Sequence, residues 1–282
     1  MKDQSKDAFL AKSVWILLNS PRSFRIIFGK LMSALIYKKR VKTMSQSIQQ
    51  SFVHVEQDEA RCIAKQSVEY QASGIVHCLD IPDMKYELVN STRYFDLAEH
   101  LRERPAIFVS LHMGFADMPT YILNKMGIPT ATLIGRGENT PAFNVLGCKI
   151  LERLDIPYIK RGNNTMVQLL EEVSNGQSLI IHSDLRERGQ QVSFLNRDTT
   201  VPTTAAALAV FSDAPLYFCY TIKESANSTR CQFYLSEIER PTGQGLSRKD
   251  IIATLTETIT RKMQSTIHLH PEQWFWSYNR FK

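Results

Sequence analysis

Short apolar runs alternate along the chain with longer segments whose apolar residues recur at helical spacing. The runs are too short for typical helices and are bounded by turn-forming residues, so they predict buried strands. This alternation is typical of an α/β fold, a mainly parallel sheet with helices on both faces. The predicted strands are residues 85–89, 106–111, 130–134, 157–160, 179–181 and 216–221, with 231–238 as an antiparallel partner of the last. The predicted helices are residues 41–51, 58–78, 95–102, 116–126, 141–154, 165–173, 203–211 and 247–267.

The first 40 residues differ from the rest in pattern and in charge. They contain two apolar pieces, residues 8–18 and 24–37. Residues 1–40 hold nine Lys or Arg and two Asp, a net charge of +7, whereas residues 41–282 hold 25 basic and 26 acidic residues. We therefore divide the chain into a basic amphipathic N-terminal helical segment (1–40) and an α/β domain (41–282). The apolar stripe of the second piece is Phe24, Ile27, Phe28, Leu31 and Leu35.

A basic amphipathic helix can lie in the interface of an anionic membrane, and the clustered positive charge favours such a surface. The alternative is that the apolar stripe packs on the protein's own body, and the sequence leaves both interpretations open. Nucleic acid is a weaker partner, because we recognise no zinc-ligand spacing, RNA-binding signature or helix-turn-helix. No apolar run reaches the roughly 18–20 residues of a spanning helix, and no secretory signal is recognisable.

The spacing of the cysteines and histidines indicates whether the chain forms disulfide bonds or a metal site. Five scattered cysteines without a C-x-x-C spacing predict a reducing compartment and no disulfide framework. The histidines are dispersed, with no pair of ligands at helical spacing, and His268 and His270 are typical of a solvated helix end. The sequence therefore predicts no metal site.

Polar residues follow four of the predicted strands at the point where each strand ends. His112 follows residues 106–111, and Arg136, Arg161 and Asp184 follow the next three strands along the chain. The carboxyl ends of parallel strands lie at the same edge of a sheet, where α/β folds place their ligands. We expect these four side chains to gather around one crevice.

His112 is followed five residues later by Asp117, with Gly114 between them. Positions i and i+5 do not share a helical face, so the two side chains meet only if the chain turns, which Gly114 permits. Asp117 would then accept a hydrogen bond from one imidazole nitrogen, and the other nitrogen would act as a general base. The alternative is an ordinary histidine at a strand end, followed by an aspartate that favours the helix dipole.

The H-x-x-x-x-D spacing resembles the motif of the glycerolipid and lysophospholipid acyltransferase superfamily. Further stretches, in order from about Lys38 to the last residue, resemble its branch of lipid A late (secondary) acyltransferases. The resemblance implies a glycerolipid acyltransferase-like fold and makes His112 and Asp117 the catalytic pair. The stretches are Leu133-Ile134-Gly135-Arg136, Leu179-Ile180-Ile181-His182-Ser183-Asp184, Phe194-Leu195, Pro202, Ala214-Pro215-Leu216, Pro271-Glu272-Gln273-Trp274-Phe275-Trp276 and Arg280-Phe281-Lys282.

The other charged residues are candidates for substrate binding. By position in the family, Arg136 is the first choice to bind an anionic group, either an acceptor phosphate or the donor's phosphopantetheine. Asp184 is predicted to pair with Arg136 or to form a second polar wall of the site. Arg161 is a weaker candidate. Arg186 and Arg188 would contact acceptor phosphates or an acidic carrier protein, although a solvated charged loop explains them equally well.

The first functional hypothesis is a fatty acyltransferase. It implies a donor on the phosphopantetheine of an acyl carrier protein, no cofactor of the enzyme's own, and lipid A or its precursor as acceptor. It also implies that the protein is located at the cytoplasmic face of the bacterial inner membrane. Because no G-x-S-x-G nucleophile motif is present, direct transfer is favoured over an acyl-enzyme.

Two alternatives stay open. Met113-Gly114-Phe115-Ala116 stands where the family often has aromatic and Asn residues, and Asp213 stands where Gly is common. These departures leave room for a branch that transfers glycine from a carrier protein to lipid A and so confers resistance to cationic antimicrobial peptides. The last alternative is a non-catalytic protein that binds the membrane surface.

Overall fold

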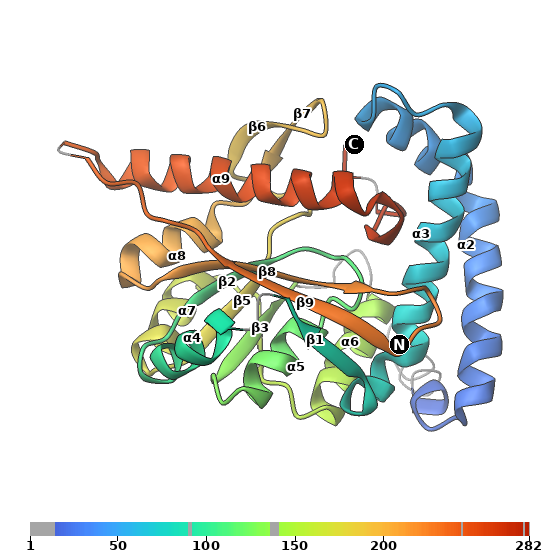
Figure 1. The fold of residues 1–282 in the computed structure, drawn as a ribbon, viewed down its shortest axis with the longest axis horizontal. Coiled ribbons are helices and arrows are strands. Elements are labelled where there is room, and N and C mark those ends of the chain that lie inside the picture. The colour runs from blue at the N-terminus through green and yellow to red at the C-terminus, as the bar shows by residue number, and fades with distance from the viewer. Residues whose placement is uncertain (1–14, 90–91, 136–140, 244, 279, 282) are drawn as a thin grey trace, which may run out of the picture.

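The computed structural model describes residues 15–89, 92–135, 141–243, 245–278 and 280–281. A sheet of seven strands forms its centre, with the spatial order β1-β9-β8-β2-β5-β3-β4 (Figure 1). The five strands from β8 to β4 run parallel, and β9 is antiparallel to β8. The predicted α/β class and the antiparallel last strand are confirmed. The strands are β1 (Lys85–Leu88), β2 (Ile107–Ser110), β3 (Thr130–Ile134), β4 (Tyr158–Lys160), β5 (Ser178–His182), β8 (Leu216–Lys223) and β9 (Arg230–Glu237).

Helices cover both faces of the sheet. They are α4 (Thr92–Glu103), α5 (Met118–Lys125) and α6 (Pro141–Arg153) on one face, and α7 (Thr165–Ser174), α8 (Thr204–Ser212) and α9 (Arg248–Leu269) on the other. A hydrophobic core lies on each face of the sheet, and β2 contributes side chains to both. Ile107 and Val109 pack with α7 to α9, whereas Phe108 packs with α4 to α6. Its four residues are fully buried, as its uninterrupted apolar sequence predicts for a central parallel strand.

Two long helices, α2 (Arg22–Ser51) and α3 (Gln57–His77), lie side by side at one end of the sheet (Figure 1). The predicted helix 41–51 is only the last part of α2, because the basic residues before it are good helix formers and nothing there breaks the helix. The predicted domain boundary at residue 40 therefore lies inside α2, and the division into two domains stays a prediction.

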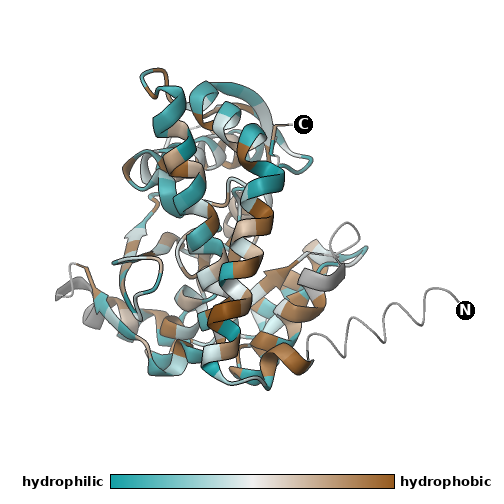
Figure 2. Ribbon diagram, turned by 90° about the vertical axis from the view of Figure 1, so that its right-hand side faces the viewer, coloured by the Kyte–Doolittle hydropathy of each residue, from teal (hydrophilic) through white to brown (hydrophobic). Residues whose placement is uncertain are grey.

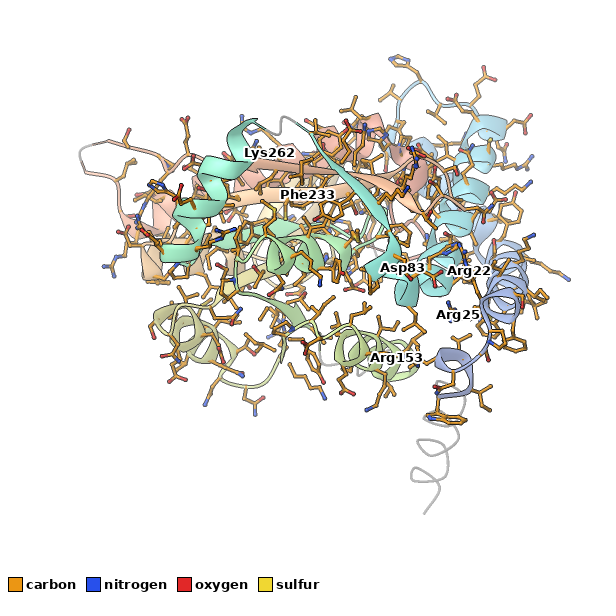
Figure 3. The ribbon with its side chains drawn as sticks, turned by 60° about the horizontal axis from the view of Figure 1, so that its bottom comes forward. Arg22, Arg25, Asp83, Arg153, Phe233 and Lys262 are labelled. Carbon is orange, nitrogen blue, oxygen red and sulfur yellow. The ribbon has the colours of Figure 1, made fainter. Side chains whose placement is uncertain are left out.

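The start of α2 is fixed by an ion-pair cluster. Arg25 is buried, and its Nη2 lies 2.7 Å from Asp80 Oδ1 while its Nε–H donates to the carbonyl of Val76. Asp80 lies on the 3₁₀ segment η1 (Cys78–Asp83), and Arg22 lies 3.3 Å from the same carboxylate. Figure 3 labels Arg22 and Arg25 at the start of α2. A carboxylate shared by two guanidinium groups resists separation more than one surface pair would. The cluster therefore holds α2 against the end of α3.

The exposed face of α2 settles which way its apolar stripe points. Four of the five stripe residues are about half exposed or more, from 47% at Phe24 to 67% at Ile27. Figure 2 faces this helix and shows hydrophobic residues along it. The interpretation that the whole stripe packs on the protein's own body is wrong. Within the described residues, no helix has the length and apolar character needed to cross a membrane.

Two elements near the carboxyl end of β5 were not predicted. Strands β6 (Gln190–Phe194) and β7 (Arg197–Val201) form an antiparallel hairpin through a turn with positive φ at Leu195 and Asn196.

After α9, which begins with a capping box at Ser247 and Asp250, the 3₁₀ turn η2 (Pro271–Gln273) brings the last residues back over the sheet edge. Trp274 forms an isolated β-bridge with Met113, next to His112.

Candidate active site

His112 and Asp184 follow neighbouring parallel strands. Strands β2 and β5 are paired with Ser110 opposite His182, and His112 and Asp184 each follow two positions after these last strand residues. The strand register therefore puts the two side chains opposite each other. His112 Nδ1 lies 2.8 Å from Asp184 Oδ1, and the His112 backbone N–H donates to Asp184 Oδ2 at 2.9 Å.

The Asp184 carboxylate is fully buried and is held by a third donor, the indole Nε1–H of Trp274, at 2.8 Å. Burial alone would favour the neutral acid. The charge of His112, with the hydrogen bonds from His112 and Trp274, outweighs burial and holds the pKa of Asp184 well below its usual range. Asp184 is therefore a carboxylate at neutral pH.

This carboxylate fixes the tautomer of His112. An ionised carboxylate only accepts hydrogen bonds, so Nδ1 carries the proton and the neutral ring keeps its lone pair on Nε2. Burial disfavours the imidazolium, but the charge and hydrogen bond of Asp184, with smaller contributions from Asp117 and Glu187, raise the pKa of His112 above 6.5. The side chain is 32% exposed, so a substrate can reach it.

The predicted role of Asp117 needs a correction. We expected Asp117 to accept the imidazole hydrogen bond, but Nδ1 binds Asp184 instead. Asp117 is the N-cap residue of α5, beyond the turn at Gly114, and it acts on His112 through its charge. Its own pKa is raised by burial, and the charge of His112 opposes that shift. The strand register decides which of the two carboxylates accepts the hydrogen bond from His112. This register cannot be inferred from a local five-residue spacing.

His182 is a site residue that the sequence analysis did not single out. Its ring centroid lies 4.7 Å from that of His112, and its Nε2 lies 3.2 Å from the carbonyl oxygen of Ala116. Burial and the neighbouring charge of His112 lower its pKa to about 4, so it is neutral at pH 7 and Nε2–H donates to Ala116. Its position two residues before Asp184, on the same side of β5, was the available signal.

The turn after His112 is packed tightly against β8. Gly114 has a φ of +57°, and a Cβ at this position would collide with the backbone oxygen of Thr221. The Thr221 hydroxyl accepts from the Phe115 N–H at 3.3 Å and lies 3.1 Å from the Phe115 carbonyl oxygen. Only glycine fits both the backbone angle and the close approach. The strand–turn geometry behind His112 is therefore rigidly determined.

The predicted arginines fall into three groups. Arg161 Nη1 lies 2.5 Å from Glu187 Oε2, so its charge is compensated across the loop that follows Asp184. Arg186 and Arg188 are exposed in that same loop. Arg136 lies outside the described residues, and both its binding role and its predicted pairing with Asp184 stay predictions.

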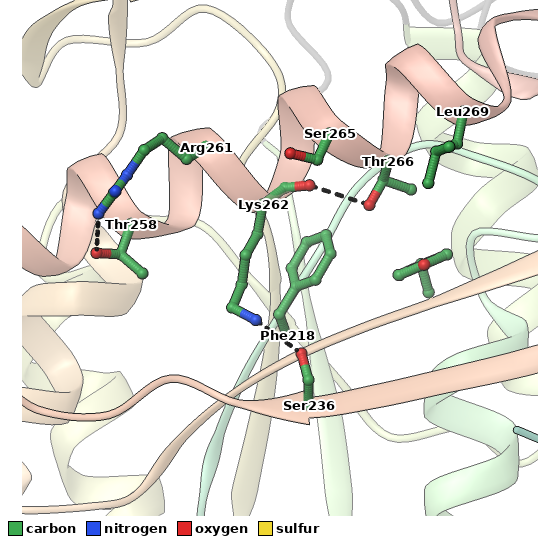
Figure 4. Close-up of a pocket in the computed structure, with 9 residues that line it drawn as sticks. Phe218, Ser236, Thr258, Arg261, Lys262, Ser265, Thr266 and Leu269 are labelled. Atoms are coloured by element: carbon green, nitrogen blue, oxygen red, sulfur yellow. Dashed lines mark hydrogen bonds between the residues drawn. The ribbon is translucent and has the colours of Figure 1, made fainter. Parts of the chain in front are cut away.

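Two hollows of the surface lie away from His112. One, of about 410 Å³, lies between α9 and the strands β8 and β9, where Lys262 Nζ donates to Ser236 Oγ at 3.1 Å (Figure 4). The other, of about 520 Å³, lies between α2 and α3. Within the described residues, no cluster of three or more His, Cys, Asp or Glu side chains could hold a metal ion.

A known family shares this sequence pattern across nearly the whole chain. Residues 7–282 match the model of the family described as bacterial lipid A biosynthesis acyltransferase. The chain belongs to this family. It is therefore an acyltransferase, and the family implies acyl transfer in lipid A biosynthesis with lipid A or a precursor as acceptor. No curated protein sequence matches the chain.

Substitution of the two carboxylates distinguishes their roles. Asp184→Asn keeps the size of the side chain but removes the charge and lets the amide donate, so His112 loses its fixed tautomer. We expect kcat to fall by roughly 10²–10⁴-fold in this variant. Asp117→Asn removes a charge that makes no hydrogen bond to His112, and we expect a loss of less than about tenfold. Steady-state acyl transfer by the purified variants measures both, and a larger loss in Asp117→Asn would contradict the assignment.

Proposed function

We propose that the protein transfers an acyl group from the thioester of a carrier protein to a hydroxyl of lipid A or its precursor. The observation that supports this proposal most directly is the hydrogen bond from His112 Nδ1 to Asp184, because it leaves the Nε2 lone pair free. No hydrogen bond to Nε2 is present within the described residues. A base of this kind is what an alcohol acceptor needs.

The reaction proceeds directly between the two substrates. Nε2 of His112 takes the proton of the acceptor hydroxyl as its oxygen attacks the thioester carbonyl carbon. The tetrahedral intermediate collapses, the carbon–sulfur bond breaks, and the carrier's phosphopantetheine thiolate leaves. The imidazolium then gives its proton to the thiolate and returns to the neutral base. Asp184 stays ionised throughout and stabilises the imidazolium.

The phosphopantetheine that holds the acyl group belongs to the donor, so the protein itself requires no cofactor in this scheme. Arg136 stays our candidate for a phosphate of either substrate, and Arg186 and Arg188 for an acidic carrier protein. Arg161 is a weaker candidate still, because its guanidinium is engaged by Glu187.

The exposed stripe of α2 supports attachment to a membrane surface. Apolar side chains at Phe24, Ile27, Leu31 and Leu35 lie on one side of α2, and Trp15 and Ile16 before it are also exposed. Lys30, Lys38, Lys39 and Arg40 add positive charge along the same helix. This combination is typical of a helix that lies in the interface of an anionic bilayer. We therefore place the protein at the cytoplasmic face of the bacterial inner membrane, where lipid A precursors are presented to it.

Mass spectrometry of lipid A tests the proposed reaction. Cells that express the protein should contain lipid A heavier by one fatty acyl group, and cells with His112→Ala should not, because the base is absent. His100→Ala changes an exposed histidine of α4 and is the matched control, with an expected product level equal to that of the unaltered protein.

The mass increment also separates the donor alternatives. A glycyl increment would replace the fatty acyl donor by an aminoacyl one while leaving the role of His112 in place. Unchanged lipid A in cells that make the folded protein would contradict both forms of the proposal.

Vesicle binding tests the membrane surface. Ile27→Glu combined with Leu31→Glu places two charges in the apolar stripe, and we expect the partition coefficient for anionic vesicles to fall by at least about tenfold. Val167→Glu, on an exposed apolar residue of α7, is the matched control and should bind normally. Moderate salt should release part of the unaltered protein, because charge contributes to binding. Equal binding by the α2 and α7 variants in vesicle sedimentation would contradict this orientation.

A further inference from the structure

Arg280 is a buried cation without a hydrogen-bonding partner in the described part of the chain. Its side chain is 1% exposed, and none of its three guanidinium nitrogens forms a hydrogen bond there. The guanidinium carbon lies 4.0 Å from the centroid of the Phe194 ring, in the hairpin β6–β7. A buried charge that is not compensated is strongly destabilising, so a nearby opposite charge is expected.

The compensating charge is Asp184. Trp274 connects the two, because its ring centroid lies 6.0 Å from that of Phe194 and its indole N–H donates to the Asp184 carboxylate at 2.8 Å. Burial lowers the pKa of Arg280 to about 10, and the negative charge of Asp184 opposes this shift. Arg280 is thus still a cation at neutral pH, and Phe194 and Trp274 connect its guanidinium to the carboxylate that orients His112.

We infer that Arg280 is a positioning residue for the proposed reaction, because its buried guanidinium is the counter-charge that moderates the field of Asp184 on His112. The inference rests on the proposed function for its consequence in catalysis. In this proposal Arg280 makes no contact with substrate. It acts through Asp184 and so sets how strong a base His112 is.

The sign of the effect follows from the charges around His112. Asp184 after β5, Asp117 at the start of α5 and Glu187 in the following loop all favour the imidazolium, and His182 is neutral. Arg161 pairs with Glu187, so that carboxylate already has a counter-charge. Arg280 is the cation that Phe194 and Trp274 connect to Asp184, and it favours the neutral base. Loss of its charge removes the positive charge that opposes Asp184, so the pKa of His112 should rise further above 6.5.

Arg197 provides a matched control on the same hairpin. Its guanidinium carbon lies 3.9 Å from the ring of Phe281, and Phe194 and Arg197 face each other across β6 and β7. The two adjacent terminal residues Arg280 and Phe281 therefore make reciprocal cation–ring contacts with the hairpin. The pKa of Arg197 is lowered by burial alone, with no contribution from Asp184. Loss of Arg197 removes the same kind of packing but not the counter-charge.

The test measures the titration of His112 in the full-length protein by NMR, with ring-labelled histidine and the signal assigned through His112→Ala. We expect Arg280→Met to raise the pKa of His112 by about half a pH unit or more. Arg280→Lys and Arg197→Met should leave the pKa near that of the unaltered protein. Arg280→Gln, which keeps a polar side chain without the charge, replaces Arg280→Met if the latter does not fold.

Acyl transfer as a function of pH gives the second measurement. The acid limb of kcat/KM should move to higher pH in the uncharged variants, with a roughly threefold loss on the acid side that disappears at high pH. An unchanged or lowered pKa of His112 in the NMR titration would overturn the inference, whatever the activity. The expected shift in a protein with no transfer activity would uphold it and contradict the proposed function instead.

Discussion

The hydrogen bond between His112 and Asp184 is the interaction on which the site depends. It exists because β2 and β5 are neighbours in register, so that residues 72 positions apart in sequence end up opposite each other at one sheet edge. The bond does two things that a lone histidine cannot do. It keeps the proton on Nδ1, and it makes Nε2 a stronger base by holding a carboxylate next to the ring.

The surroundings of this pair are built to keep it in place. The carboxylate also accepts from Trp274, which the C-terminal segment brings back over the sheet edge, and the turn after His112 is fixed by Gly114 against β8. Arg280 adds a positive charge that compensates this carboxylate in our proposal. Parts of the chain from β2 to the last residues therefore converge on one imidazole, and this convergence explains why the C-terminal residues matter to a site formed by central strands.

Much of the fold could be predicted from the sequence because apolar runs and helical periodicity are local signals. Strand β2, just before His112, and the antiparallel pair β8–β9 are examples, since each is marked by residues within the segment itself. The hairpin β6–β7 was missed because its strands are half exposed, and its turn relies on positive φ at Leu195 and Asn196 rather than on glycine. The extent of α2 is longer than predicted because the three basic residues 38–40 change the charge pattern of the chain without breaking the helix.

The site was predicted in part. His112 and Asp184 were placed at the same edge by the rule for parallel strands, but the order of the strands in space was not available. Without that order, the nearer residue Asp117 was the natural partner for His112. The actual partner depends on β5 lying beside β2, which is a long-range property of the sheet. His182 was overlooked for the same reason, because its importance appears only when the two strands are paired.

The tautomer of His112 tests the central claim most directly. Nitrogen NMR of the full-length protein with labelled histidine should show the proton of the neutral ring on Nδ1, and this preference should be lost in Asp184→Asn but retained in Asp117→Asn. A proton on Nε2 in the unaltered protein, or a preference for Nδ1 that survives in Asp184→Asn and is lost in Asp117→Asn, would contradict the account.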